Sequence, residues 1–112
     1  MMRAPLAFVL AIAATGAALT DVAFAASPYD GTWAVRPQAC ATQFLKLEPG
    51  GRFENRLGNE AKTGRFRARE DRLEFREDDG DEQTMPVMDH ADTLLVLFDD
   101  TVEADRRLVK CR

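Results

Sequence analysis

The chain contains very few of the side chains that serve as nucleophiles or general bases. It has a single serine, Ser27, a single histidine, His90, and two cysteines, Cys40 and Cys111. A Ser-His or Cys-His catalytic pair needs a free nucleophile beside a base, and this inventory offers no ordinary route to one. Carboxylate pairs can be drawn from the acidic residues, but nearly all of these fall at outward strand positions or in turns. The sequence therefore predicts that the protein is not an enzyme.

Long hydrophobic runs are also absent, except near the N-terminus. Arg3 precedes an apolar stretch over residues 6–19, and Ala23-Phe24-Ala25 matches the small-x-small pattern that signal peptidase recognises. The stretch covers about 14 residues, whereas a membrane span needs about 20. We expect residues 1–25 to be a cleaved signal peptide and residues 26–112 to form a single domain. Its style suits a bacterium, so we expect a periplasmic or secreted protein with no stable membrane anchor after cleavage.

The two cysteines lack the close spacing of a redox or metal motif. In an oxidising compartment we expect them to form the disulfide Cys40–Cys111. The bridge closes a loop of about 70 residues, which the chain-entropy model credits with about 4 kcal/mol. The net charge of -4 gives no support to nucleic-acid binding.

Two acidic segments contain side chains that bind metals. Asp89-His90-x-Asp92 offers three metal-capable side chains within four residues, and the run over residues 77–82 is rich in carboxylates. The run lacks the alternating spacing and the distal glutamate of a helical calcium loop. We interpret both segments as solvated turns, and predict no metal and no cofactor.

Short alternating segments separated by turns dominate the rest of the chain. No window of ten or more residues after the signal peptide shows the 3.6-residue period of an amphipathic helix. The strand segments fall at 31–36, 42–48, 52–57, 64–69, 72–77, 83–88, 93–98 and 105–112. About eight short strands joined by short turns predict an all-β fold, either an antiparallel barrel or a two-sheet sandwich.

The segment over residues 64–77 gives the clearest hairpin. With a two-residue tip at 70–71, the cross-strand pairs are Phe66–Phe75 and Ala68–Leu73 inside and Arg67–Glu74 outside. Every pair is of a favourable kind. Glu-Asp is a poorer two-residue turn than Asn-Gly, so a four-residue turn or a bulge that shifts the register by one stays open.

Arginines gather on the outward side of this hairpin, at Arg65, Arg67, Arg69, Arg72 and Arg76. Guanidinium groups bind carboxylates and phosphates bidentately, so this row is a candidate patch for an anionic ligand or an acidic partner. The alternative is an ordinary solvated strand face, partly neutralised by neighbouring glutamates.

The inward positions of the segments define the expected core. They are Trp33, Val35, Leu45, Leu47, Phe53, Phe66, Leu73, Phe75, Val87, Leu95 and Leu97. With several large aromatic residues inside so short a barrel, side chains are expected to fill the interior and to leave little volume for a ligand.

The opening Gly31-Thr32-Trp33 resembles the Gly-x-Trp on the first strand of lipocalins, fatty-acid-binding proteins and avidins. The later strand-and-turn pattern, including Gly64-x-Phe66 and Asp71-x-Leu73-x-Phe75, is similar to that of small bacterial lipocalin-like barrels. The resemblance implies an up-and-down antiparallel barrel, closed here by one disulfide. A weaker resemblance is to small-barrel inhibitors of secreted metallopeptidases, whose N-terminal arm enters the enzyme's cleft. It implies such an arm at Ser27, Pro28 and Tyr29.

These observations predict an exported, non-enzymatic binding or interaction module that acts through its surface or its barrel mouth. Its partner is a protein or a small ligand that the sequence does not identify. Two alternatives stay open, a peptidase inhibitor that uses the N-terminal arm and a carrier of a small apolar ligand.

Overall fold

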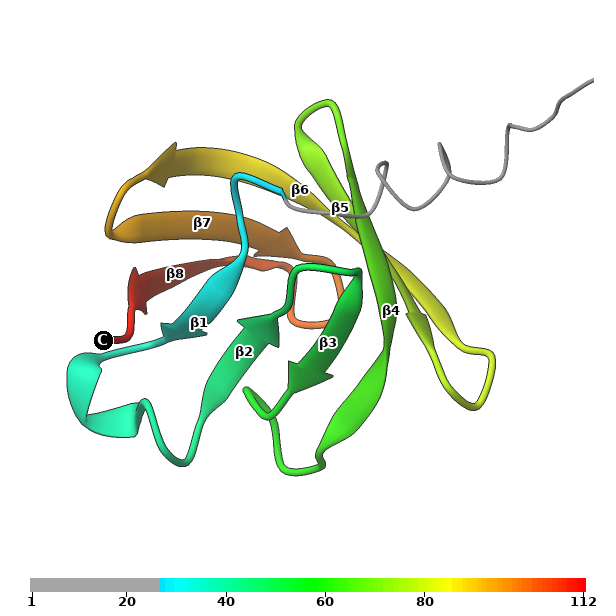
Figure 1. Cartoon of the computed structure of the whole chain (residues 1–112), viewed down its shortest axis with the longest axis horizontal. Coiled ribbons are helices and arrows are strands. Elements are labelled where there is room, and N and C mark those ends of the chain that lie inside the picture. Colours follow the sequence, from blue (N-terminus) through cyan, green and yellow to red (C-terminus); the bar gives the residue numbers. More distant parts are fainter. Residues whose placement is uncertain (1–26) are drawn as a thin grey trace, which may run out of the picture.

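The protein is an eight-stranded antiparallel β-barrel in a computed structural model that describes residues 27–112. Each strand pairs with the next along the chain, and the last strand pairs back with the first, as Figure 1 shows. The predicted barrel is therefore confirmed and the sandwich alternative is wrong. The signal peptide predicted over residues 1–25 lies outside the described residues.

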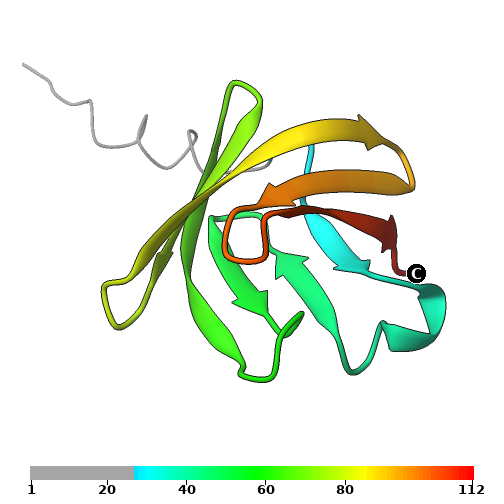
Figure 2. The ribbon, with the colours of Figure 1, turned by 180° about the vertical axis from the view of Figure 1, so that it is seen from behind.

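The elements follow one another with short connections. They are β1 (Gly31–Ala34), the 3-10 turn η2 (Pro37–Ala39), β2 (Phe44–Leu47), β3 (Arg52–Asn55), β4 (Lys62–Arg69), β5 (Arg72–Glu77), β6 (Glu82–Ala91), β7 (Leu94–Asp99) and β8 (Ala104–Lys110). The hairpins β4–β5 and β5–β6 extend past the barrel body at opposite ends, which both ribbon views show (Figures 1 and 2).

The predicted register of the β4–β5 hairpin is confirmed. Phe66 lies opposite Phe75, Ala68 opposite Leu73 and Arg67 opposite Glu74, with Arg69 and Arg72 closing a two-residue turn. Glu70 provides that turn with a φ of 57°, in the left-handed region that few residues other than glycine and asparagine adopt readily. The alternation of apolar and charged residues therefore outweighed the poor turn sequence in setting the register.

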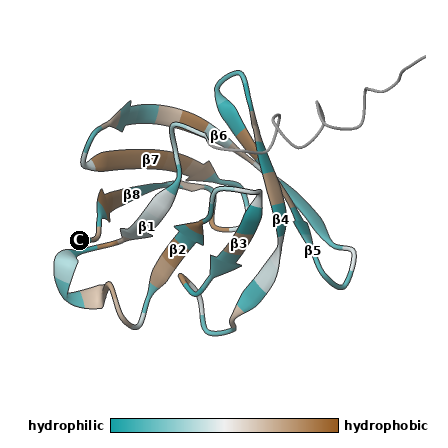
Figure 3. Ribbon diagram, in the orientation of Figure 1, coloured by the Kyte–Doolittle hydropathy of each residue, from teal (hydrophilic) through white to brown (hydrophobic). Residues whose placement is uncertain are grey.

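Inward side chains from all eight strands form one core. The most deeply buried large side chains, each less than 2% exposed, are Trp33, Leu45, Leu47, Leu73, Met85, Leu95, Leu97 and Leu108. Phe53 and Phe75 pack edge to face with their ring centroids 5.0 Å apart. Colouring by hydropathy shows the same pattern, with β7 largely apolar and the outer hairpins largely polar (Figure 3). The core is continuous through the barrel.

Three details differ from the sequence predictions. Val35 is 37% exposed rather than inside, because β1 ends at Ala34 and the chain leaves the sheet for the η2 turn. β6 continues to Ala91, so the turn expected around His90 begins only at Asp92. Cys111 follows β8 instead of lying within it.

The disulfide closes the barrel where its first and last strands meet. Only two residue pairs, Trp33–Lys110 and Ala34–Val109, join β1 to β8. Just beyond them Cys111 donates its backbone N–H to Thr32 and its sulfur bonds to Cys40, 71 residues earlier. The predicted bridge is confirmed, and it reinforces the seam with the fewest paired residues.

Within residues 27–112, no helix has both the length and the apolar character that a membrane crossing requires.

Candidate functional site

Six arginines on neighbouring strands share one outer face of the barrel, which we call the arginine face. It comprises Arg52 on β3, Arg65, Arg67 and Arg69 on β4, and Arg72 and Arg76 on β5. Successive side chains on a strand alternate between the two sides of a sheet, so the inward positions Phe66 and Phe75 force the arginines outward. The same alternation that builds the core therefore builds the arginine face.

The arginines are arranged in cross-strand rows of different character. Arg65 lies directly opposite Arg52 on one side and Arg76 on the other. Arg69 lies opposite Arg72, which makes a second pairing of like charges. Like charges directly opposite each other destabilise a sheet, so these rows oppose folding electrostatically.

Acidic neighbours compensate some of these guanidinium groups. Arg52 forms a bidentate pair with Asp78, with distances of 3.1 and 3.2 Å, and Thr63 donates to the same carboxylate at 2.7 Å. The hydrogen bond from Arg52, followed by that from Thr63, lowers the pKa of Asp78 below its usual range. Asp78 is therefore committed to this pair at neutral pH.

Glu74 compensates two arginines of the middle of the face. It accepts from Nε of Arg67 at 2.9 Å and from Nε of Arg72 at 3.0 Å. These two hydrogen bonds, with that from Arg67 the stronger, lower the pKa of Glu74. Arg76 has only a longer contact of 3.8 Å to Glu82.

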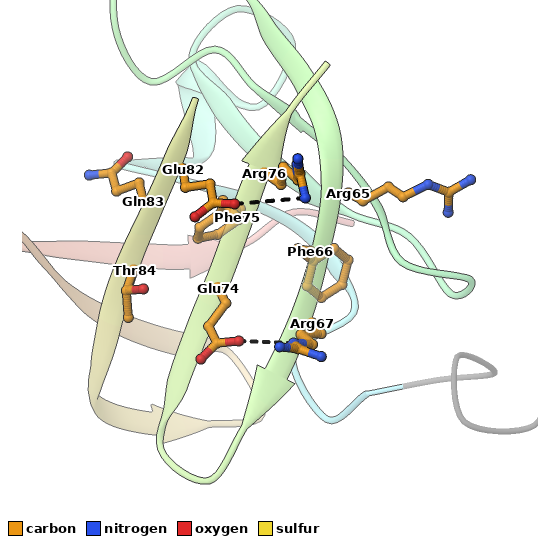
Figure 4. A pocket seen from close by; sticks show the side chains of 9 residues that line it. All are labelled: Arg65, Phe66, Arg67, Glu74, Phe75, Arg76, Glu82, Gln83 and Thr84. Atoms are coloured by element: carbon orange, nitrogen blue, oxygen red, sulfur yellow. Dashed lines mark hydrogen bonds and ion pairs between the residues drawn. The ribbon is translucent and has the colours of Figure 1, made fainter. Parts of the chain in front are cut away.

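Two guanidinium groups of the face have no such partner. In the part of the chain that the structure describes, no ion pair joins Arg65 or Arg69 to a carboxylate. Both side chains are exposed. In Figure 4, Arg65 extends away from the Arg67–Glu74 and Arg76–Glu82 pairs. These two side chains are therefore available to bind an external anion.

A groove of about 490 Å³ lies beside Arg65, over β4, β5 and β6. It is lined by charged side chains of the arginine face together with Glu82, Thr84 and the edges of Phe66 and Phe75 (Figure 4). The groove thus combines cationic, anionic and hydrogen-bonding groups above the buried rings of Phe66 and Phe75.

The barrel mouth at the end of β7 holds a second, smaller pocket of about 350 Å³. Its wall includes Asp99, which is 4% exposed, and the half-buried Arg106. Asp99 accepts hydrogen bonds from the Gln83 side chain, from Thr101 and from Arg106, at distances of 2.6 to 3.1 Å. Every oxygen of Asp99 is therefore occupied by the protein itself, which makes it a structural residue of the mouth.

The opposite end of the barrel is occupied by the N-terminal segment. Tyr29 is 8% exposed and belongs to the core, and its backbone oxygen accepts from Nε1 of Trp33 at 2.9 Å. The Ser27 hydroxyl and backbone N–H bond the carboxylate of Asp30 at 2.9 Å each, which fixes the turn. The segment expected as an arm, Ser27 to Tyr29, thus folds against its own barrel.

The two segments considered for metals differ in geometry. Glu77, Asp79 and Asp81 bring one carboxylate oxygen each to within 4.8 Å of one another, at the β5–β6 turn. His90 instead packs against the Tyr29 ring, 4.7 Å between centroids, and does not join a cluster with Asp89 and Asp92 among the described residues. Exposed acidic turns of this kind commonly remain solvated, and no other feature of residues 27–112 marks the first cluster as a metal site.

Three residues of these sites were not found from the sequence. Arg52 belongs to the arginine face because β3 pairs with β4. Asp99 and Arg106 lie on different strands, and the pattern of alternation gave Asp99 only as the start of a turn. Opposite charges seven residues apart around a turn were the one available signal.

No protein-family model, curated protein or solved structure matches this chain. The barrel and its disulfide are compatible with a lipocalin-like architecture, whereas membership of a lipocalin-like family stays a prediction.

Proposed function

We propose that this protein is an exported, non-enzymatic binding module that contacts its partner through its outer surface. The filled interior carries the proposal. Side chains from every strand meet inside the barrel, and eight of the largest are less than 2% exposed. A carrier of an apolar ligand needs an internal cavity, and the close burial of these side chains within residues 27–112 argues against one.

The disulfide supports the exported location, since disulfides form and persist in the periplasm and outside the cell. The signal-peptide pattern of residues 1–25 supports an exported location independently. The lipocalin-like resemblance agrees with the barrel but adds nothing about the partner.

Of the two alternative functions, peptidase inhibition through the N-terminal arm is the less favoured. An arm that inserts Tyr29 into an enzyme would first have to withdraw that ring from the core. The contact with Trp33 would be lost at the same time. For an apolar carrier, the mouth pocket offers a wall of mixed character, in which Leu57 and Met85 lie among charged and polar side chains.

Native mass spectrometry of the exported, oxidised protein tests the proposal. In a second experiment, a photo-crosslinking residue is placed either at the exposed Thr84, beside the groove, or at the exposed Asp105 on β8. The yields of protein crosslinks from the two positions are compared. We expect no bound small molecule and a discrete protein crosslink from one outer face. A retained apolar molecule, displaced by a long-chain fatty acid, would contradict surface binding and favour the carrier.

A further inference from the structure

The arginine face contains rows of like charge that neighbouring carboxylates offset only in part, because Asp78 and Glu74 interact with Arg65 and Arg69 at longer range while forming their hydrogen bonds with other arginines. Arg65 stands between Arg52 and Arg76, and Arg69 stands opposite Arg72. Neither Arg65 nor Arg69 has a carboxylate partner within residues 27–112. Like charges placed opposite each other across strands, with two exposed members that form no ion pair of their own, are characteristic of a functional surface.

The spacing of these two groups defines the ligand. Arg65 and Arg69 leave the same side of β4 four residues apart, a distance of roughly 13 to 14 Å along a strand. An extended peptide places its residues i and i+4 on one side at the same separation. Carboxylates at i and i+4 of such a peptide therefore match both guanidinium groups at once.

The charges between the two arginines further restrict the kind of anionic ligand that can bind. Arg67 lies midway but is engaged by Glu74, and Glu82 adds a second carboxylate at the groove. A uniformly anionic polymer, such as a sulfated polysaccharide, would be repelled by these glutamates. A peptide that presents acidic side chains only at every fourth position avoids that repulsion, because its residue i+2, opposite Arg67 and Glu74, is uncharged.

We infer that the arginine face binds an extended acidic segment of a partner protein along the outside of β4, with Arg65 and Arg69 each holding a carboxylate. This inference rests on the proposed surface-binding function and specifies its partner. The groove of about 490 Å³ opens beside Arg65 and Arg67, across β4, β5 and β6. Arginine suits the role because its planar fork holds a carboxylate bidentately.

Fluorescence anisotropy of labelled peptides tests the inference on the exported, oxidised protein. The probe is a ten-residue peptide with Glu at positions 3 and 7 and Thr at every other position, and the control peptide replaces both Glu residues by Gln. We expect saturable binding of the Glu peptide alone, weakened as salt is raised. Replacing Arg65→Gln or Arg69→Gln should each weaken binding about tenfold, the loss of one charged hydrogen-bonded contact.

Arg107→Gln is the matched control, because Arg107 is an exposed arginine on β8, outside the arginine face. The Arg107→Gln variant should bind the Glu peptide with the same affinity as the unsubstituted protein. Melting temperatures of all three variants confirm folding, and the two test variants should melt no lower, since each relieves a pairing of like charges.

Several outcomes overturn the inference. Equal binding of the Gln peptide, or no effect of either test variant, removes the arginines from the site. Tight binding of dextran sulfate through the same arginines without binding of the Glu peptide assigns the face to a polysaccharide. A crosslinked partner on another face, with no peptide binding, overturns this inference alone, whereas a retained small molecule in native mass spectrometry overturns the proposed function itself.

Discussion

Arg106 donates a hydrogen bond from Nε to Oδ2 of Asp99 over 3.0 Å, which joins the two strands on either side of the last turn of the barrel. The Asp99 side chain is 6% exposed and that of Arg106 is 26% exposed. Thr101 and Gln83 fill the other acceptor positions of the carboxylate. A buried carboxylate with four donors organises the mouth, and its removal leaves each donor without its acceptor.

Replacing Asp99→Ala should therefore lower the free energy of unfolding by about 1 to 3 kcal/mol, the cost of leaving buried polar groups unsatisfied. Urea unfolding monitored by the fluorescence of Trp33 measures the loss. Asp100→Ala is the matched control, because the neighbouring Asp100 is exposed and has only a contact of 3.5 Å to Gln83. Equal losses in the two variants would show that the Asp99 network contributes little.

The same carboxylate predicts how stability depends on pH. Burial tends to raise the pKa of Asp99, but hydrogen bonds from Thr101 and Arg106 outweigh it, and the pKa lies below its usual range. A lowered folded-state pKa contributes stability above the unfolded value of about 3.9, and this contribution disappears as the pH falls through the folded pKa. The stability difference between the unsubstituted protein and Asp99→Asn should thus shrink below about pH 4.

Urea unfolding of both proteins between pH 2 and pH 7 measures that difference. Asp78 and Glu74, whose pKa values are also lowered, are present in both proteins and cancel in the comparison. A difference that stays constant down to pH 2 would mean that Asp99 does not titrate differently in the folded state.

Much of the barrel could be predicted from residue alternation, whereas its ends could not. The register at Phe66 and Phe75 follows from local alternation, which fixes inside and outside. Val35 was misplaced because the pattern continues past Ala34 while the backbone already turns toward Pro37, which cannot donate to a neighbouring strand. Alternation reports the face of a strand and not the point at which pairing stops.

The arginine face and the mouth show the same limit from the side of function. Five of the six arginines of the face were predicted, because they share one hairpin, and Arg52 joins them only through the pairing of β3 with β4. Asp99 meets Gln83 and Arg106 from two other strands. Contacts between strands depend on how each strand pairs with its neighbour, which the pattern of a single strand does not contain.

The position of Gly64 is expected to tolerate no side chain. A Cβ built there would collide with the backbone oxygen of Arg76 and lie 2.7 Å from Cα of Glu77 and 2.8 Å from Cε1 of Phe53. Because two of these atoms belong to the paired backbone of β5, no side-chain rotation relieves the collision. Gly64→Ala should destabilise the protein by about 1 to 3 kcal/mol or more.

Gly58→Ala is the control for this prediction, since a Cβ at Gly58 has no atom within 4 Å. Thermal melts followed by circular dichroism compare the two variants. If both melted alike, the close approach of β4 and β5 at Gly64 would be wrong.

Removing the disulfide should weaken the seam between β1 and β8. Replacing both Cys40 and Cys111 with Ser removes a bridge between residues 71 apart, worth about 4 kcal/mol in the chain-entropy model. We expect the melting temperature to fall by about 10 °C or more. Differential scanning calorimetry measures the change, and reduction of the unsubstituted protein should reproduce it. A double variant that melts like the parent would show that the two residue pairs between β1 and β8 keep the barrel closed without the bridge.

Tyr29 tests whether the N-terminal segment is part of the fold or a free arm. Its ring is 8% exposed and contacts the His90 ring, and Tyr29→Ala should cost about 3 kcal/mol, near the lower end for a buried aromatic side chain. Tyr29→Phe keeps the ring and should retain most of the stability. Chemical unfolding of the two variants provides the comparison. If Tyr29→Ala were as stable as the parent, the ring would be free to leave the core. Peptidase inhibition by insertion of this segment would then be favoured over binding through the arginine face.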